Sequence, residues 1–376
     1  MDRIEELLSL FQEISENPRE QMDEYLMEGK KIIGCFPYYV PEEIIAAAGM
    51  VPFGLWGKHG TPKAAKEYFA SFYCSIAQMG LEMVLDGTLE GISGILCTTL
   101  CDTLRPLTQN LKTVCKVPFI FLAHPQNRKP EYGITFTRRQ YENVKKQIET
   151  IAGKAITEED LWGAIRIYND NRKALRRFVE LAGKYPREIS AVCRGAVLKS
   201  RHFMKKEEHT ALLTELNGLL ENLPEEKWTG AKVLTSGIIL DNPKLLKLFD
   251  EQKLVIVADD VAHESRAIRK DVRESGDAMD ALARHFASQD EDTILYDAKW
   301  HKRSSYIVDK VRSSGAVGVV ISMMTFCDPE EIEYPSLKKA LEEEGIPYIM
   351  LGYDHQIEDF GQAATSLQAF ADIAVP

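Results

Sequence analysis

The stretch GISGILCTTLCDTLRP (residues 91–106) joins a short apolar run to a turn and to the start of a helix-like segment. The run GISGIL is typical of a buried strand in a parallel sheet. The turn that follows places Cys101 where the strand gives way to the helix. Ligands of open α/β sheets bind at the carboxyl ends of strands. Cys101 is therefore either a small buried residue or a ligand at a functional edge.

The same alternation of apolar runs and helix-like stretches occurs at both ends of the chain. Eight runs indicate strands, at 30–36, 51–56, 91–96, 117–123, 231–238, 253–260, 318–324 and 346–352. Between the two sets, helical periodicity begins with a capping-box pattern of Thr157 and Asp160 and continues to about Leu223. The predicted fold is α/β, with two doubly wound parallel-sheet domains joined by a helical segment.

Chain length and composition agree with a globular protein of several domains. The 376 residues include 45% hydrophobic residues, which is enough to form large cores. We predict an N-terminal α/β domain with a leading helix over residues 1–156, a helical segment over 157–226, and a C-terminal α/β domain over 227–376.

The two α/β parts resemble each other in the order of their segments, which predicts an internal duplication. In each part a Cys-Asp pair follows a strand, as Cys101 with Asp102 and Cys327 with Asp328. The duplication places the two cysteines at equivalent carboxyl ends of strands.

Charge and hydropathy exclude several classes of partner. The net charge of -11 argues against a surface that binds nucleic acid or an anionic membrane. The first residues read as a helix without the basic start of an export signal, and no run reaches the roughly 18 apolar residues of a membrane span. Seven scattered cysteines do not resemble the framework of a small secreted domain. We expect a cytoplasmic protein with free thiols.

The segment FCDPEE (326–331) predicts a helix start with Asp328 as N-cap and Pro329 in the first position. A thiolate at Cys327 would then be stabilised by the positive end of the helix dipole, unless the residue is simply buried. Cys74 lies either in the first turn of a helix that begins near Ser71 or inside a longer helix.

Other candidate groups lack a pattern that indicates chemistry. Cys97 is predicted to be strand core, and Cys35, Cys115 and Cys193 have no partnered spacing. His59, His124 and His355 fall in or near loops, but none has metal-ligand spacing to another histidine or cysteine. Glu43 is interpreted as a helix-dipole partner, so no catalytic residue is assigned. The Walker A, GxGxxG and GxSxG patterns are missing from the sequence.

Five stretches together resemble the 2-hydroxyacyl-CoA dehydratase family, and more closely its smaller, β-type subunit. They are GCFPYYVPEEIIAAAGMVPFGLWG, FYCSIAQ, TTLCDTL, LAHPQNRK and MMTFCDPEE, in this order along the whole chain. The resemblance implies a [4Fe–4S] cluster with three cysteine ligands in the cleft between the two α/β domains. Matched motif by motif, these ligands are Cys74, Cys101 and Cys327.

The resemblance also implies a reaction and its partners. An ATP-hydrolysing iron–sulfur activator would supply one electron, and this subunit would relay it to a larger α-type subunit that binds most of the 2-hydroxyacyl-CoA. There a ketyl radical would expel the (R)-2-hydroxyl group as water and yield an enoyl-CoA. The enzyme would be an oxygen-sensitive hydro-lyase of anaerobic amino-acid fermentation, and ATP would act only through the activator.

Three other interpretations stay open at the level of sequence. The chain could be a subunit of an ATP-dependent benzoyl-CoA reductase, which shares the fold, cluster and activator. It could be a homodimeric ATP-dependent reductase with a larger bridged iron–sulfur cluster. It could instead be a cluster-free two-domain binder of small molecules, in which the cysteines only pack.

Overall fold

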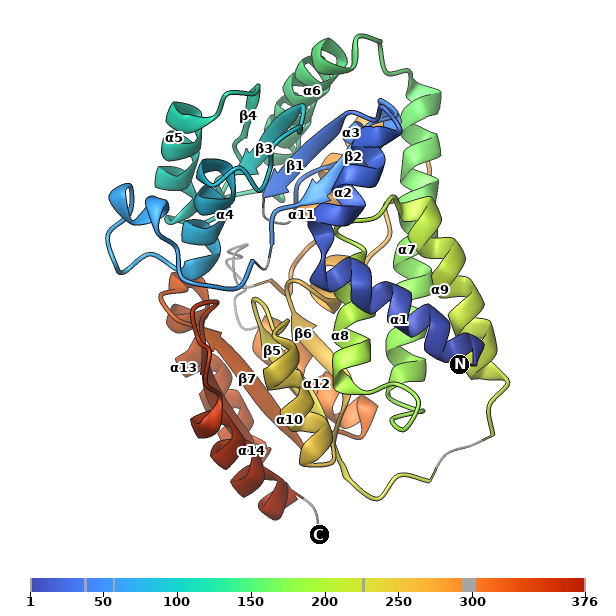
Figure 1. Ribbon diagram of the computed structural model, residues 1–376, viewed down its shortest axis with the longest axis vertical. Coiled ribbons are helices and arrows are strands. Elements are labelled where there is room, and N and C mark those ends of the chain that lie inside the picture. Colours follow the sequence, from blue (N-terminus) through green and yellow to red (C-terminus); the bar gives the residue numbers. More distant parts are fainter. Residues whose placement is uncertain (1, 37–38, 57, 225–226, 293–301, 375–376) are drawn as a thin grey trace.

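The computed structural model describes residues 2–36, 39–56, 58–224, 227–292 and 302–374. Two parallel sheets, each of four strands in this part of the chain, form the centres of two α/β layers (Figure 1). The first sheet contains β1 (Ile32–Phe36), β2 (Val51–Gly54), β3 (Gly94–Thr98) and β4 (Phe119–Leu122). The second contains β5 (Ala231–Gly237), β6 (Leu254–Val261), β7 (Gly318–Met324) and β8 (Tyr348–Tyr353). The predicted α/β class and the positions of all eight strands are confirmed to within three residues.

The two sheets have the same topology. The strand order is β2-β1-β3-β4 in the first and β6-β5-β7-β8 in the second. In each sheet the chain runs from the first strand outward to the second and then returns to the other side of the first, so a switch point lies between β1 and β3 and another between β5 and β7. The identical order supports the predicted duplication, and it places the ends of β3 and β7 at equivalent switch points.

Central strands are apolar because both of their faces are covered by helices. Every residue of β3 and of β7 is buried. In the first sheet, Cys97 lies opposite Phe36 of β1 and Phe121 of β4 and is fully buried, which confirms its assignment to the strand core.

Helices of the first α/β layer are α3 (Glu42–Ala47), α4 (Ser75–Leu85), α5 (Leu104–Val114) and α6 (Glu131–Ala152), with the 3-10 turn η1 (Ala64–Glu67). Those of the last part are α10 (Pro243–Glu251), α11 (Ala278–Ala287), α12 (Lys302–Ser314), α13 (Asp328–Glu343) and α14 (Gly361–Ala374), with η2 (Ser265–Ile268). Among the described helices, none has both the length and the apolar character needed to cross a membrane.

Between the sheets in chain order are α7 (Glu158–Ala182), α8 (Ala191–Ser200) and α9 (Lys206–Glu221). The α7 helix begins as predicted: Thr157 Oγ1 accepts the Asp160 N–H, and the Asp160 carboxylate accepts the Thr157 N–H at 2.8 Å. This reciprocal bonding satisfies two amides that a helix start leaves without partners.

Helices α1 (Arg3–Glu16) and α11 each pack against elements that are distant from them in the sequence. The leading helix α1, followed by α2 (Pro18–Met27), packs on α8 and α9 (Figure 1). Helix α11 packs on α6, and its Leu282 joins the core that contains Leu96 of the first sheet. The first sheet is therefore completed by residues from the last third of the chain. The boundaries at 156/157 and 226/227 remain a prediction.

Candidate functional site

The three predicted cysteine ligands all lie next to helix N-termini. Cys74 is the N-cap of α4, Cys327 is the N-cap of α13, and Cys101 lies two residues before Thr103, the N-cap of α5. Cys101 and Cys327 follow β3 and β7, each of which is one of the two inner strands of its sheet. All three residues are partly exposed.

Two expectations about these turns were wrong by a few residues. Asp328 is the first residue of α13 rather than its N-cap, so Cys327 itself has the cap position. The reason is that the Cys327 carbonyl already accepts the Glu331 N–H at 3.0 Å, which is the first intrahelical bond. The preceding Phe326 has a φ of 62° and donates its N–H to Glu331 Oε1 at 3.0 Å. Near Cys74, α4 begins at Ser75 rather than near Ser71.

Burial raises the pKa of each of these three thiols, whereas the backbone N–H groups at the helix starts lower it. Burial raises the pKa of Cys74 to about 12, and the backbone N–H of Ala77 opposes this shift. Burial raises the pKa of Cys101 to about 11, against the N–H groups of Leu104 and Thr103. The pKa of Cys327 is raised well above its usual value, by burial first. Without a bound cation the thiols are therefore protonated at neutral pH, and a metal centre would displace their protons.

The structure brings these three residues, here called the thiol site, into one neighbourhood. A charge on Cys101 raises the pKa of Cys74, and charges on Cys74 and Cys101 raise that of Cys327. Direct contacts support this proximity: Ser75 Oγ lies 3.5 Å from Met324 Sδ, which joins the start of α4 to the end of β7. The site thus receives residues from both sheets.

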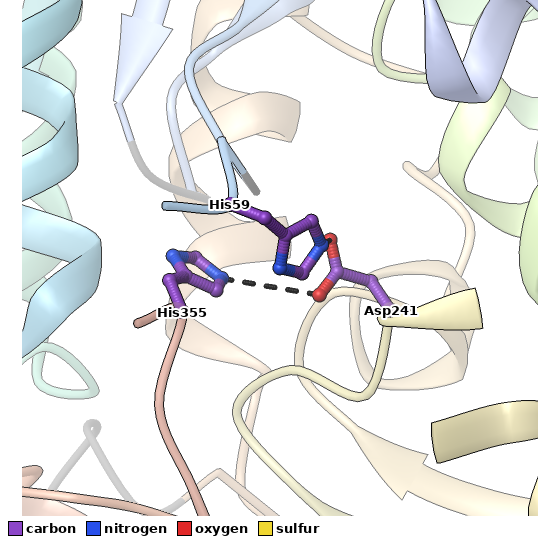
Figure 2. Close-up of side chains that lie close together, drawn as sticks. All are labelled: His59, Asp241 and His355. Atoms are coloured by element: carbon purple, nitrogen blue, oxygen red, sulfur yellow. Dashed lines mark ion pairs between the residues drawn. The ribbon is translucent and has the colours of Figure 1, made fainter. Parts of the chain in front are cut away.

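A second group was missed by the sequence analysis. In the part of the chain that is described, His59, Asp241 and His355 each place a donor atom within 4.8 Å of the other two (Figure 2). We call them the His–Asp–His group. They come from the loops after β2, β5 and β8. The two histidines are far apart in the sequence, but this does not argue against a shared site. The three loops come together only when both sheets have formed.

Asp241 is the centre of the His–Asp–His group. Its Oδ2 lies 3.3 Å from His59 Nε2 and accepts a 2.7 Å bond from Lys199 Nζ, while its Oδ1 accepts a 2.7 Å bond from the Tyr353 hydroxyl. Burial opposes ionisation, but Lys199 and His59 hold the pKa of Asp241 well below its usual range. Burial lowers the pKa of His355 to about 4, so this imidazole is neutral at pH 7.

A family model described as "2-hydroxyglutaryl-CoA dehydratase, D-component" matches residues 37–373. The chain belongs to this family. It is 48% identical over 375 residues to the β subunit of (R)-2-hydroxyglutaryl-CoA dehydratase from Acidaminococcus fermentans, covering 98% of this chain and 99% of that one. It is 41% identical over 374 residues to the (R)-phenyllactyl-CoA dehydratase β subunit from Clostridium sporogenes, covering 99% and 100%.

A more distant relative is a benzoyl-CoA reductase subunit from Thauera aromatica, which is 27% identical over 354 residues, covering 91% of this chain and 90% of that one. The higher identities are to dehydratase β subunits. Within the D-component family, the chain is therefore of the β-subunit type and is an enzyme subunit of the hydro-lyase class.

In this D-component family member, Glu43 lies in the first turn of α3, as expected for a helix-dipole partner, and it is also paired with a cation. It is 4% exposed and forms a buried ion pair with Arg172 of α7. Its neighbour Glu42 accepts a 3.0 Å bond from the Tyr168 hydroxyl. The carboxylate of Glu43 is thus neutralised inside the fold, which agrees with leaving it without a catalytic role.

Proposed function

We propose that this chain is the iron–sulfur β subunit of an oxygen-sensitive (R)-2-hydroxyacyl-CoA dehydratase and relays one electron to a larger α-type subunit. In this proposal Cys74, Cys101 and Cys327 hold a [4Fe–4S] cluster between the two sheets. The observation that carries it is the thiol site itself, in which three partly exposed cysteines from both sheets lie at helix starts.

The residues of the thiol site fit an anionic cluster. When bound, the cluster supplies a one-electron redox centre with one iron free of cysteine. The amides of Ala77, Thr103 and Glu330 lie close enough to favour negative charge on the neighbouring sulfurs. Such backbone donors stabilise the thiolates and influence the reduction potential. The protein's contribution is therefore to fix three sulfurs and to surround them with N–H groups.

The rest of the proposal concerns partners. The α-type subunit binds most of the 2-hydroxyacyl-CoA, where a ketyl radical eliminates water to give the enoyl-CoA. A separate ATP-hydrolysing iron–sulfur activator supplies the electron, and the complex works in the cytoplasm. Support comes from the names of the relatives, two of which are β subunits of dehydratases that act on different 2-hydroxyacyl-CoA compounds.

The test is anaerobic purification of the chain with its α-type partner, followed by iron and sulfide analysis and an assay with activator, ATP and reductant. We expect about four irons on this chain and turnover of an (R)-2-hydroxyacyl-CoA only when both subunits are present. Turnover by this chain alone would favour the homodimeric reductase. A colourless preparation without iron would favour a cluster-free small-molecule binder.

The second candidate function is that of an ATP-dependent benzoyl-CoA reductase subunit, which is supported by the 27% identity to the Thauera aromatica protein. The same complex should be offered benzoyl-CoA and (R)-2-hydroxyglutaryl-CoA in parallel. Reduction of the first without dehydration of the second would replace the dehydratase proposal.

A further inference from the structure

The His–Asp–His group has the donor set of a transition-metal site. Two imidazoles and one carboxylate are a common ligand set for zinc and for non-haem iron. Asp241 Oδ2 lies 3.3 Å from His59 Nε2, and Asp241 Oδ1 lies 3.8 Å from His355 Nε2. Ligand atoms on one such cation are about 3.0 to 3.5 Å apart, since each lies about 2 Å from the metal. Small side-chain rotations would complete the site.

His355 gives an independent reason to expect a ligand. The residue is 1% exposed, yet neither of its ring nitrogens makes a hydrogen bond to a described residue. Buried polar atoms nearly always have a partner, so an imidazole in this condition is typical of a group that binds something else. Figure 2 shows its Nε2 directed toward Asp241 and the space beside His59.

We propose that His59, Asp241 and His355 bind a first-row divalent cation, for which Zn²⁺ is the probe. This site is separate from the thiol site and does not depend on the proposed function. A cavity of about 520 Å³, with His59 and Asp241 in its wall, gives the cation a route to the site. Tyr353 donates to Asp241 Oδ1 and so orients the carboxylate from outside, as the second shell of a metal site commonly does.

Lys199 provides a test of the proposal, because its ammonium group would compete with a bound cation for the Asp241 carboxylate. Its Nζ donates to Asp241 Oδ2 at 2.7 Å, so its positive charge opposes that of a cation. Replacing Lys199 by methionine keeps most of the side-chain volume and removes this charge. A metal site predicts tighter zinc binding in Lys199→Met, whereas a simple ion-pair network predicts no zinc binding in either protein.

The experiment measures zinc by titration calorimetry and elemental analysis on the full chain with Cys74, Cys101 and Cys327 changed to serine, because thiols also bind zinc. We expect one zinc per chain. His355→Gln and His59→Gln should weaken binding at least tenfold, and Lys199→Met should tighten it at least tenfold. The matched control is His263→Gln, since His263 is also 1% exposed with unbonded ring nitrogens but lies outside the group. It should retain the zinc.

Two results would overturn the metal site. One is no zinc binding in either the background chain or Lys199→Met. The other is an equal loss of zinc binding in His263→Gln and His355→Gln.

Far-UV circular dichroism checks that each variant folds. His59→Gln should disturb folding least, because the His59 side chain is 28% exposed. If the serine background does not fold, zinc and iron are counted separately in the iron-loaded wild type, His59→Gln and Lys199→Met proteins. No zinc in wild type and Lys199→Met, or equal zinc in His59→Gln, would then reject the site.

Discussion

The backbone N–H of His355 donates a 3.1 Å hydrogen bond to Ser75 Oγ, although 280 positions separate the two residues in the chain. Ser75 follows Cys74 directly and is fully buried, so this bond fixes the start of α4 against the loop after β8. The thiol site and the His–Asp–His group therefore share one structural support.

Ser75→Ala should destabilise the fold and loosen the thiol site together. The change leaves the His355 N–H without its acceptor, which costs about 1 to 3 kcal/mol in a buried position. Urea unfolding measures the loss, and iron content after anaerobic purification should fall. Ser71→Ala is the control, because Ser71 is exposed in the turn before Cys74. Equal stability of the two variants would contradict the shared support.

Cys327→Ser and Cys97→Ser should have opposite effects. Cys327 is partly exposed at the cap of α13, so serine there should lower iron content and turnover while leaving the unfolding free energy nearly unchanged. Cys97 is fully buried in β3, where a hydroxyl costs about 1 to 3 kcal/mol but the cluster should remain. Full iron and full turnover in Cys327→Ser would remove this residue from the ligand set.

Asp260→Asn should be among the most destabilising substitutions in the C-terminal part. The buried Asp260 carboxylate binds Arg269, accepts a 2.6 Å bond from Arg303 Nε and lies 3.1 Å from Arg266. Removing its negative charge leaves the buried positive charges of these arginines without their shared partner. The free energy of unfolding should fall by about 3 to 5 kcal/mol. Asp271→Asn is the control, because its 2.8 Å pair with Arg176 is partly exposed and is worth about 0 to 1 kcal/mol. Denaturant unfolding of both variants gives the comparison.

The pH dependence of stability should contain a contribution from buried His124. Burial lowers the pKa of His124 to about 3, whereas the unfolded side chain titrates near its ordinary value of 6.5. The unfolded state therefore binds more protons between these values, so stability falls as pH decreases from about 6.5 toward 3. At pH 5 this one residue contributes about 2 kcal/mol of destabilisation relative to pH 7.

The measurement is urea unfolding at pH 7 and pH 5 for wild type and His124→Leu. His124 stacks on Phe286 with ring centroids 4.2 Å apart, so leucine should retain much of the packing. We expect a smaller loss between the two pH values in the variant. An unchanged loss would show that His124 is already protonated or exposed in the folded state.

Local sequence predicted the strands and the start of α7, and it singled out Cys101 and Cys327 as candidate ligands at strand ends, because each of these features depends on neighbours within a few residues. Cys74 was found only through the family resemblance, since its cap position depends on where α4 begins. The His–Asp–His group could not be found from spacing, because His59, Asp241 and His355 follow strands of two different sheets. Their one shared signal was their place at carboxyl ends of strands.

Packing across the chain also lies outside local prediction. Helix α11 has an ordinary amphipathic pattern that indicates a helix but not its neighbour. Its contact with α6 is determined by which apolar faces remain uncovered once both sheets have formed.

The repeated strand order has a consequence for how the two halves of the chain can change. In a symmetric pair of separate chains, each substitution would appear in both copies. Fusion into one polypeptide lets corresponding loops diverge independently. The loop after β2 carries His59 and leads to Cys74, whereas its counterpart after β6 carries Arg266 and Arg269, which bind Asp260. The first of these two loops thus carries side chains that can coordinate ions, whereas the second belongs to an internal scaffold of charges.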